Sequence, residues 1–272
     1  MTAINTNVGA LNARASAVKS TTRMETAMER LSSGMRINSA ADDAAGLSVA
    51  GKMESQLRGI NMSIRNAQDG IGLIQTAESG LNEIRNMVLR IRELAVQMAN
   101  GIYEDTPDRN NAQLEVTALI NQVTLIAENT RFNDVAILDG SFTGVTIQAG
   151  NTTAETVTLS FIDVASSGLS IDTATVATQS DATVAMGTMD TAIQTISEEQ
   201  AKFGSLINRL DYSIGNQSKA SVMTEQAIGR IMDSDFATET TSLSKQQILN
   251  QAATSMLAQA NQSKQSILAL LQ

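Results

Sequence analysis

The sequence predicts a mostly α-helical protein: a long antiparallel coiled-coil helical rod with a small β-hairpin region in the middle of the chain. In both flanks of the 272-residue chain, apolar residues recur at alternating steps of three and four. This is the spacing of helices that pack against other helices. The single proline, Pro107, permits long uninterrupted helices. Only the middle of the chain changes to the alternation that is typical of a strand.

The N-terminal segment predicts an amphipathic helix of about 30 residues. Ser33-Gly34 and then Asn38-Ser39 interrupt its pattern, so we expect a break within 33–43. The run from Ser39 to Asp42 has the form of a capping box, which would start the next helix. The predicted helix carries an apolar seam in two phases: Ile4, Val8, Leu11, Ala15 and Val18, then Met24, Met28, Leu31 and Met35.

The next segment predicts one long helix, because a single seam runs from Met53 to Met98 with one departure from the alternating steps. Each glycine inside a helix costs about 1 kcal/mol relative to alanine. Either the helix tolerates its glycines, or they allow close backbone approach by neighbouring helices. The glycines in question are Gly59, Gly70, Gly72 and Gly80.

A shorter helix follows. Asn100-Gly101 ends the long helix, and Thr106 stands in the N-cap position with Pro107 at the first helical position. We expect this helix to reach about Asn129. Its predicted buried stripe is Val116, Leu119, Val123 and Ile126.

The middle of the chain predicts short strands. Residues 135–138 and 145–147 are apolar and β-branched, with a turn at Asp139-Gly140 between them. Val157, Leu159 and Phe161 alternate with polar residues, and 149–152 is the expected hairpin turn. Residues 163–181 show no clear period and predict a connecting loop.

The last third predicts a second long helix and a terminal one. A seam runs from Met189 to Ile231 without losing phase, and Asp233-Ser234-Asp235 then interrupts it and could cap a new helix. The simplest packing pairs the two long helices and the two end helices. The end seams cannot be fully buried within one two-helix hairpin, so we expect them to bind further copies of the chain. We assign this assembly seam to Ile4, Val8, Leu11, Val18, Leu249, Ala253, Met256, Ala260, Ile267 and Leu270.

The composition excludes much of enzyme chemistry. The chain has no His and no Cys, so imidazole bases, thiolate nucleophiles and Cys/His zinc sites are unavailable, and we expect no enzyme, no cofactor and no metal. The adjacent carboxylates Asp42-Asp43 and Glu198-Glu199 would point in different directions on a helix, so each is more typical of a cap or a solvated face.

The net charge of −9 argues against a nucleic-acid partner. No apolar run approaches the ~20 residues of a membrane span, and the N-terminus has no pattern of a cleaved signal.

Three stretches go beyond periodicity. Residues 30–46 read RLSSGMRINSAADDAAG, the segment 63–99 contains RNAQDGIGLIQTAESGLNEI and RIRELAVQMA, and the chain ends in SDFATETTSLSKQQILNQAATSMLAQANQSKQSILALLQ. Together they resemble bacterial flagellin, over roughly 1–142 and 188–272. The resemblance implies five regions: an N-terminal inner-core helix (1–42), N-terminal outer-core helices (43–140), a short variable middle with a β-hairpin (141–185), a C-terminal outer-core helix (186–233) and a C-terminal inner-core helix (234–272).

The resemblance also implies a function. Flagellins are structural subunits that self-assemble into the extracellular flagellar filament for swimming motility, and their terminal helices fold as the polymer forms. They are secreted unfolded through a type III export channel, after an export chaperone has covered the C-terminal helix, and they meet hook–filament junction and cap proteins. A hook–filament junction protein shares such ends and is the alternative. An intracellular coiled-coil adaptor fits the periodicity but not the motifs.

Host recognition is a further implication of the resemblance. A Toll-like receptor binds a patch on the outer-core helix of flagellins, and the matching run here is Leu89 to Val96, with Glu115 on the following helix. The candidate receptor contacts are therefore Arg90, Leu94 and Glu115. The charges in this patch could equally serve contacts between subunits.

Overall fold

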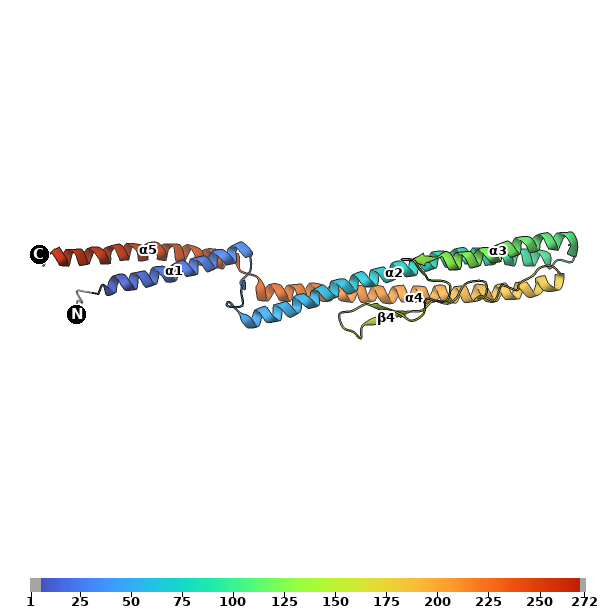
Figure 1. Cartoon of the computed structure of the whole chain (residues 1–272), viewed down its shortest axis with the longest axis horizontal. Helices are drawn as coiled ribbons and strands as arrows, with labels where there is room; N and C mark the ends of the chain where they lie inside the picture. The colour runs from blue at the N-terminus through green and yellow to red at the C-terminus, as the bar shows by residue number, and fades with distance from the viewer. Residues whose placement is uncertain (1–5, 270–272) are drawn as a thin grey trace. The chain divides into compact units, whose positions relative to one another are not determined.

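The computed structural model describes the backbone of residues 6–269 and the side chains of 6–263. Five α-helices make up most of this described part: α1 (Val8–Ser33), α2 (Ala44–Met98), α3 (Asn110–Asn129), α4 (Gln179–Met232) and α5 (Phe236–Ala269). The predicted mostly helical fold with a small strand region is confirmed (Figure 1). The chain divides into two compact units, which we call the terminal unit (Met1–Leu57 and Val222–Gln272) and the central unit (Arg58–Ser221). Helices α2 and α4 contribute residues to both.

Two small antiparallel strand pairs lie in the middle of the chain. Strand β3 (Val145–Gln148) pairs with β4 (Thr156–Leu159), with Val145 opposite Leu159, so the predicted hairpin is confirmed. Strand β1 (Arg131–Phe132) pairs with β2 (Val135–Ala136) across a turn at Asn133 and Asp134, both of which have positive φ. The sequence analysis missed β1, because a two-residue strand is too short to show a period.

The break after α1 lies where it was predicted. Gly34 adopts the left-handed conformation (φ 72°) and its N–H donates to Arg30 O at 2.9 Å, which ends the helix. The predicted capping box forms only in part and does not start the helix: the Asp42 carboxylate accepts from Ser39 N at 2.9 Å, as in a capping box, but within a turn that precedes α2. The cap of α2 is Asp43, four residues after Ser39, where Gly46 N donates to Asp43 Oδ1 at 2.9 Å.

The two junctions between helices in the terminal unit pair with each other. Arg36 N donates to Met232 O at 2.6 Å, and Ser234 N donates to Gly34 O at 3.0 Å. Asp235 then caps α5, as predicted, by accepting from Ala237 N at 2.9 Å and Thr238 N at 3.3 Å. Hydrogen bonds from Thr238, first from its hydroxyl, lower the pKa of Asp235. A single cap therefore fixes where the C-terminal helix begins.

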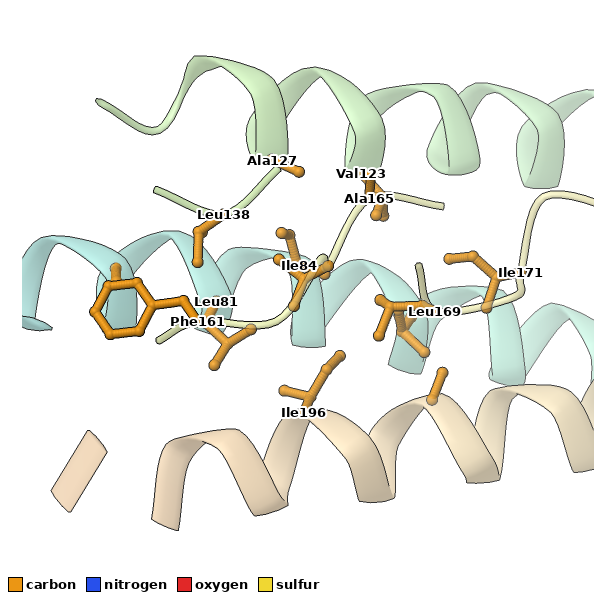
Figure 2. Packing of buried hydrophobic residues seen from close by; sticks show 14 of the residues in the cluster. Leu81, Ile84, Val123, Ala127, Leu138, Phe161, Ala165, Leu169, Ile171 and Ile196 are labelled. Atoms are coloured by element: carbon orange, nitrogen blue, oxygen red, sulfur yellow. The ribbon is translucent and has the colours of Figure 1, made fainter. Parts of the chain in front are cut away.

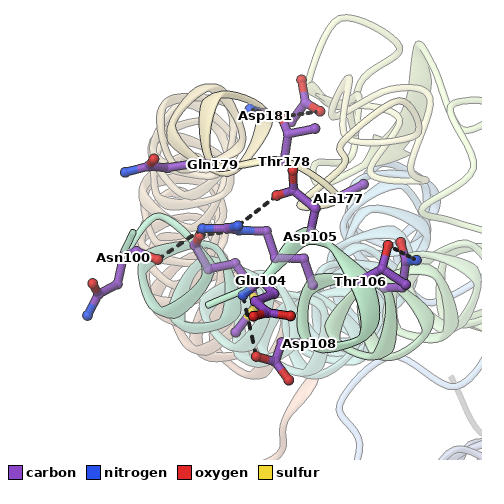
Figure 3. Close-up of polar contacts among 12 residues, drawn as sticks. Asn100, Glu104, Asp105, Thr106, Asp108, Ala177, Thr178, Gln179 and Asp181 are labelled. Atoms are coloured by element: carbon purple, nitrogen blue, oxygen red, sulfur yellow. Dashed lines mark hydrogen bonds and ion pairs between the residues drawn. The ribbon is translucent and has the colours of Figure 1, made fainter. Parts of the chain in front are cut away.

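The start of α3 differs from the prediction. Thr106 has an extended backbone (φ −134°, ψ 121°) and does not cap a helix; a π-helical turn, η1 (Asp105–Arg109), stands before α3 instead. The reason lies with Arg109, which is 4% exposed. Its guanidinium turns back to the end of α2 and donates to Met98 O at 2.9 Å and Asn100 O at 3.0 Å. The last carbonyls of α2 are thus satisfied by a side chain of the next element; Figure 3 shows the polar contacts of this corner.

Helices α2 and α4 run antiparallel in the central unit with one constant register. Ser221 donates to Asn61 at 3.3 Å, and Gln200 donates to Asn82 at 2.7 Å. The step from Asn61 to Asn82 on α2 equals the step back from Ser221 to Gln200 on α4. Continuing by equal steps leads to the ion pair of Arg92 with Asp190. The polar edge of the helix pair therefore fixes which residues meet in its core.

Helix α4 begins at Gln179, before the residue 186 at which the helical region was expected to start. Thr178 supplies the cap, since its hydroxyl accepts from Asp181 N at 3.1 Å and donates to the Asp181 carboxylate at 2.7 Å. A Ser or Thr followed three residues later by an acid was the available signal, and it lay inside the run that we interpreted as a loop.

The segment between α3 and α4, residues 130–178, which we call the middle segment, belongs to the core of the central unit. Figure 2 shows side chains of the middle, among them Leu138, Phe161, Leu169 and Ile171, meeting those of α2, α3 and α4. Phe161 packs against Phe203 of α4 with ring centroids 4.7 Å apart. In the described chain the segment forms no compact unit of its own.

Three of the four glycines of α2 explain how the middle segment comes so close to that helix. A Cβ added at Gly70 would lie 2.3 Å from Ile147 Cδ1, one at Gly80 would lie 2.8 Å from Thr130 Oγ1, and one at Gly59 would strike the Asn151 side chain. Steps of ten or eleven residues are about three helical turns, so these glycines share one face of α2. The predicted close approach exists, but the end of α3 and the β3–β4 hairpin make it rather than neighbouring helices. Gly72 has nothing within 4 Å.

Candidate functional site

Helices α1 and α5 lie side by side and antiparallel in the terminal unit (Figure 1). Polar side chains link them along their length. Asn7 Nδ2 donates to Ala260 O at 3.1 Å, Asn250 Nδ2 donates to Thr21 Oγ1 at 2.7 Å, and Arg30 Nη1 donates to Glu239 Oε1 at 3.1 Å. These links fix the register of the pair.

The contact between α1 and α5 buries small and polar side chains. Among the described residues of the two helices, only Ser20, Ala27, Gln246 and Ala253 are buried. The face of α1 toward this contact carries alanines at the 3–4 spacing, with Ala10, Ala13 and Ala17 half-buried. Because apolar stabilisation scales with the area removed from water, such a contact is weak for its length.

Most of the large apolar side chains described on the two helices point elsewhere, while Met24, Leu31, Leu243 and Leu257 are half-buried. Val8, Leu11 and Val18 on α1 are 56%, 54% and 60% exposed, and Met256 on α5 is 65% exposed. We define the exposed apolar set of the terminal unit as the large apolar residues of α1 and α5 that share this property: Val8, Leu11, Val18, Met28, Phe236, Ile248, Leu249 and Met256.

The predicted assembly seam therefore splits into two faces. Ala253 is buried and Ala260 half-buried in the α1–α5 contact, whereas Val8, Leu11, Val18, Leu249 and Met256 are exposed. Ile4 and Leu270 lie outside the described residues, as does the side chain of Ile267. The sequence analysis missed the intrachain face, whose signal was the row of alanines beside the apolar seam.

An open groove runs between α1 and α5 beside this set. Its volume is about 470 Å³, and it is lined mainly by small residues, including Gly9, Ala13, Ser16, Ala253 and Ala260, with Met256 at its wall. Small side chains on facing helices leave room for a bulky apolar side chain from outside, in the way that a knob enters a hole.

The net charge separates the two units. The terminal unit holds nine basic and nine acidic residues, so its charges cancel. The central unit holds ten basic and nineteen acidic residues and thus carries the whole −9 of the chain. The exposed apolar set lies on the unit that has no net repulsion between copies.

The candidate receptor residues are brought together only in part. Arg90 Nε donates to Glu115 Oε1 at 3.0 Å and Arg90 Nη1 pairs with Glu93 at 3.2 Å; the Arg90 and Glu115 side chains are about half exposed. The hydrogen bond with Glu115 is the main cause that raises the pKa of Arg90. Leu94 is 3% exposed and belongs to the core of the central unit. Leu94 can support the surface that carries Arg90 and Glu115 from below, but almost none of its own side chain is accessible.

The described part of the chain gives little support to a metal site or a membrane span, and it separates the roles of the adjacent carboxylates. No group of three or more acidic residues there could hold a metal ion, and none of its helices is long and apolar enough to cross a membrane. Of the adjacent carboxylates, Asp42 and Asp43 accept backbone hydrogen bonds and Glu198 is exposed, as expected. Glu199 is buried (1% exposed) beside Lys202, so it is not on the solvated face that we expected.

Fold and surface together define a class of protein: a helix-rich chain whose terminal helices pair weakly and present large apolar side chains outward. Comparisons with known proteins identify the family. A family model described as the bacterial flagellin N-terminal helical region matches residues 4–143, and one described as the C-terminal helical region matches residues 186–271. The chain belongs to the bacterial flagellin family, which is a family of structural proteins and not of enzymes.

Individual relatives match over nearly the whole chain. A flagellin of Halalkalibacterium halodurans is 38% identical, with 98% of this chain and 99% of the relative covered. The flagellar filament 33 kDa core protein of Treponema phagedenis is 39% identical, with the same coverage. Among solved structures, Bacillus cereus flagellin is 33% identical with a TM-score of 0.51, covering 56% of this chain and 88% of that one.

Proposed function

We propose that this chain is the structural subunit of a bacterial flagellar filament and that neighbouring copies bury the exposed apolar set of its terminal unit. The observation that carries the proposal is the exposure of Val8, Leu11, Val18 and Met256 on helices whose own contact fully buries only small and polar residues. Full burial of such a side chain contributes about 1.5–3 kcal/mol. Several of them per copy are enough to drive stable association.

The terminal unit suits repeated contact between copies. The groove between α1 and α5 offers a place for a large apolar side chain of another copy, and the balanced charge removes net repulsion. Because the α1–α5 contact is weak by itself, neighbours that cover both helices would add most of their stability. Folding of the terminal helices is then coupled to polymerisation.

The family relatives favour the filament subunit over the junction protein. The two relatives described above are a flagellin and a filament core protein, and each is matched over nearly its full length. The shear-released surface protein of the cells tests this choice, because a filament subunit would dominate it and a junction protein would be scarce.

Substitutions on the exposed apolar set test the assembly surface. Leu11→Ser, Val18→Ser and Met256→Ser together should leave a folded helical monomer and abolish filament formation. The matched control is Leu114→Ser in the central unit, where Leu114 is 72% exposed. Negative-stain electron microscopy and sedimentation measure the polymer. Normal filaments from the triple variant would contradict the proposed surface.

Deletion of residues 236–272 is a second test, which should also give a helical monomer that forms no filaments.

Export and its partners belong to the same proposal. We infer that the chain leaves the cell unfolded through a type III channel to the extracellular filament, where it meets hook–filament junction and cap proteins. An export chaperone would cover the C-terminal helix, for which the exposed Ile248 and Met256 of α5 provide apolar contacts. Pull-down of the chaperone by wild type but not by Ile248→Ser with Met256→Ser is the expected result.

For host recognition, we propose that Arg90 and Glu115 contact a Toll-like receptor directly and that Leu94 holds the helix face beneath them. Monomer binding to the purified receptor ectodomain should weaken for Arg90→Ala and for Glu115→Ala. Leu94→Ala should weaken it as well, but together with a loss of thermal stability because Leu94 is buried. Unchanged affinity in all three variants would rule out this patch.

A further inference from the structure

We propose that Asn100 is a site of spontaneous covalent modification, at which its side-chain amide is converted through a cyclic imide into aspartate and isoaspartate. Asn100-Gly101 is the single Asn-Gly step of the sequence. It lies in the turn between α2 and η1, and both residues are exposed. Glycine at the following position matters because it has no Cβ to keep its backbone nitrogen away from the asparagine side chain.

The geometry of the turn favours attack on the Asn100 side chain. Ile102 N donates to Asn100 Oδ1 at 3.3 Å, which holds the amide carbonyl against the backbone of Gly101 and draws electron density from its carbon. The Gly101 N–H itself is engaged by no hydrogen bond within the described chain. Holding the reacting atoms together in this way lowers the entropic part of the barrier.

The two Asp-Gly steps of the chain are the natural comparison, since they could form the same imide. Asp69-Gly70 lies inside α2, where the helical ladder engages the Gly70 nitrogen. Asp139-Gly140 shares the turn geometry, because Ser141 N donates to the Asp139 carboxylate at 3.0 Å as Ile102 N does to Asn100. A carboxylate is a poorer electrophile than an amide, however, and Asp139 is only half-exposed. Only the Asn100 turn combines an exposed side chain with a free following nitrogen.

The reaction needs water and no other co-reactant. The Gly101 backbone nitrogen attacks Asn100 Cγ and forms a new C–N bond. The bond from Cγ to Nδ2 breaks, and the amide leaves as ammonia with the proton that Gly101 N gives up. Water then opens the imide at either carbonyl. One opening gives aspartate, and the other gives isoaspartate, in which the main chain runs through the former side chain.

The modification would alter the turn after α2, which the hydrogen bonds of Arg109 hold in place. Asn100 O accepts from Arg109 Nη2 at 3.0 Å, and the same guanidinium pairs with Asp105 at 2.7 Å (Figure 3). In isoaspartate the former main-chain carbonyl of residue 100 becomes the free carboxylate, and the main chain, one carbon longer, runs through Cγ instead. The new negative charge stands at the C-terminal end of α2, where it is unfavourable. Older molecules would therefore lose part of the cap of α2.

Peptide mapping by mass spectrometry tests the proposal on the full, folded chain during incubation in mildly alkaline buffer. The peptide with Asn100 should gain the mass of amide-to-acid conversion with first-order kinetics, and isoaspartyl methyltransferase should label it. The peptide with Asn151, an exposed loop asparagine followed by Thr152, serves as the internal control and should stay unmodified. Conversion of Asn100 no faster than that of Asn151 would overturn the proposal.

Two variants and a denaturant separate the effect of the local sequence on the reaction from the effect of the fold. Gly101→Ala should slow conversion several-fold, and Asn100→Gln should abolish it. The folded chain should react at least as fast as the chain in denaturant, since the turn presents the amide; a much slower folded chain would mean that the fold protects Asn100, against the proposal. Limited proteolysis near residues 100–109 should rise in aged wild type but not in freshly made Asn100→Asp, which adds the charge without rerouting the main chain. Equal rates in the two would refute the predicted effect on the corner.

Discussion

The terminal and central units are built from helices with the same heptad spacing, yet they use it differently. In the central unit the apolar stripes of α2 and α4 are covered by α3 and by the middle segment, and Ile84, Phe203 and Leu210 are fully buried. In the terminal unit α1 and α5 pair with each other, and most of the large apolar residues described on them remain exposed. A 3–4 pattern therefore specifies that a helix packs, and the rest of the chain decides whether its partner is internal.

The largest expected effect comes from comparing a buried apolar residue of the central unit with an exposed one of the terminal unit. Phe203→Ala in the central unit should lower the free energy of unfolding by about 3–5 kcal/mol, because it opens a cavity in a closed core. Val18→Ala in the terminal unit should change it by less than about 0.5 kcal/mol, because Val18 is 60% exposed. Chemical denaturation of the monomer, followed by circular dichroism, measures both. Similar losses in the two variants would erase the distinction between the units.

The cap of α2 should give the next largest effect. Arg109→Ala leaves the Met98 carbonyl without its donor and leaves Asn100 O with only the long bond from Tyr103 N (3.4 Å), which costs about 1–3 kcal/mol. Arg109→Lys should recover only part of this loss, because an ammonium lacks the planar fork that reaches both carbonyls. Thermal unfolding of the two variants, each compared with wild type, is the measurement. Full recovery by lysine would show that charge alone matters here.

The glycines of α2 offer a matched pair inside one helix. Gly70→Ala should destabilise the central unit by up to about 2 kcal/mol, since its Cβ would overlap Ile147 Cδ1. Shifting that side chain costs about 1–3 kcal/mol, against about 1 kcal/mol gained in helix propensity. Gly72→Ala meets nothing within 4 Å and should stabilise the helix by up to about 1 kcal/mol. Denaturant midpoints of the two variants should move in opposite directions. Shifts of the same sign would mean that β3–β4 does not rely on the close approach.

The smallest effect concerns pH and the terminal unit. Hydrogen bonds from Thr238 and Ala237 lower the pKa of Asp235 below its ordinary value of 3.8 in the folded state. The carboxylate therefore stabilises α5 above that ordinary value, and the contribution disappears as the pH falls through the lowered folded pKa. Asp235→Asn removes this dependence, so the melting temperatures of variant and wild type should converge in acid. A constant difference at every pH would contradict the role of the charge.

The sequence predicted most of the helical layout because helix ends carry local signals. Gly34 and Asp235 mark breaks through their own backbone and side-chain chemistry, and both were found. The start of α3 was misplaced because Arg109 acts on a helix that ended eleven residues earlier, which no local pattern records. Leu94 was assigned to a surface because a resemblance gives position in the chain and not depth. The sequence analysis missed the alanine face of α1 because the neighbouring apolar seam gives the stronger periodic signal, although that seam faces away from α5.

The close docking of the middle segment on α2 has a consequence for chain length. Ile147 and Asn151 are pressed against Gly70 and Gly59, so residues cannot be added between them without lifting the hairpin from the helix. The tip of the hairpin beyond these contacts, Thr153 and Ala154, is exposed, whereas Thr152 and Glu155 on either side are hydrogen-bonded to each other. Insertions are tolerated where backbone is exposed and few contacts depend on it. The tip is thus the one place in this hairpin where evolution, or an engineer, could graft a whole new domain while the helices beneath keep their register.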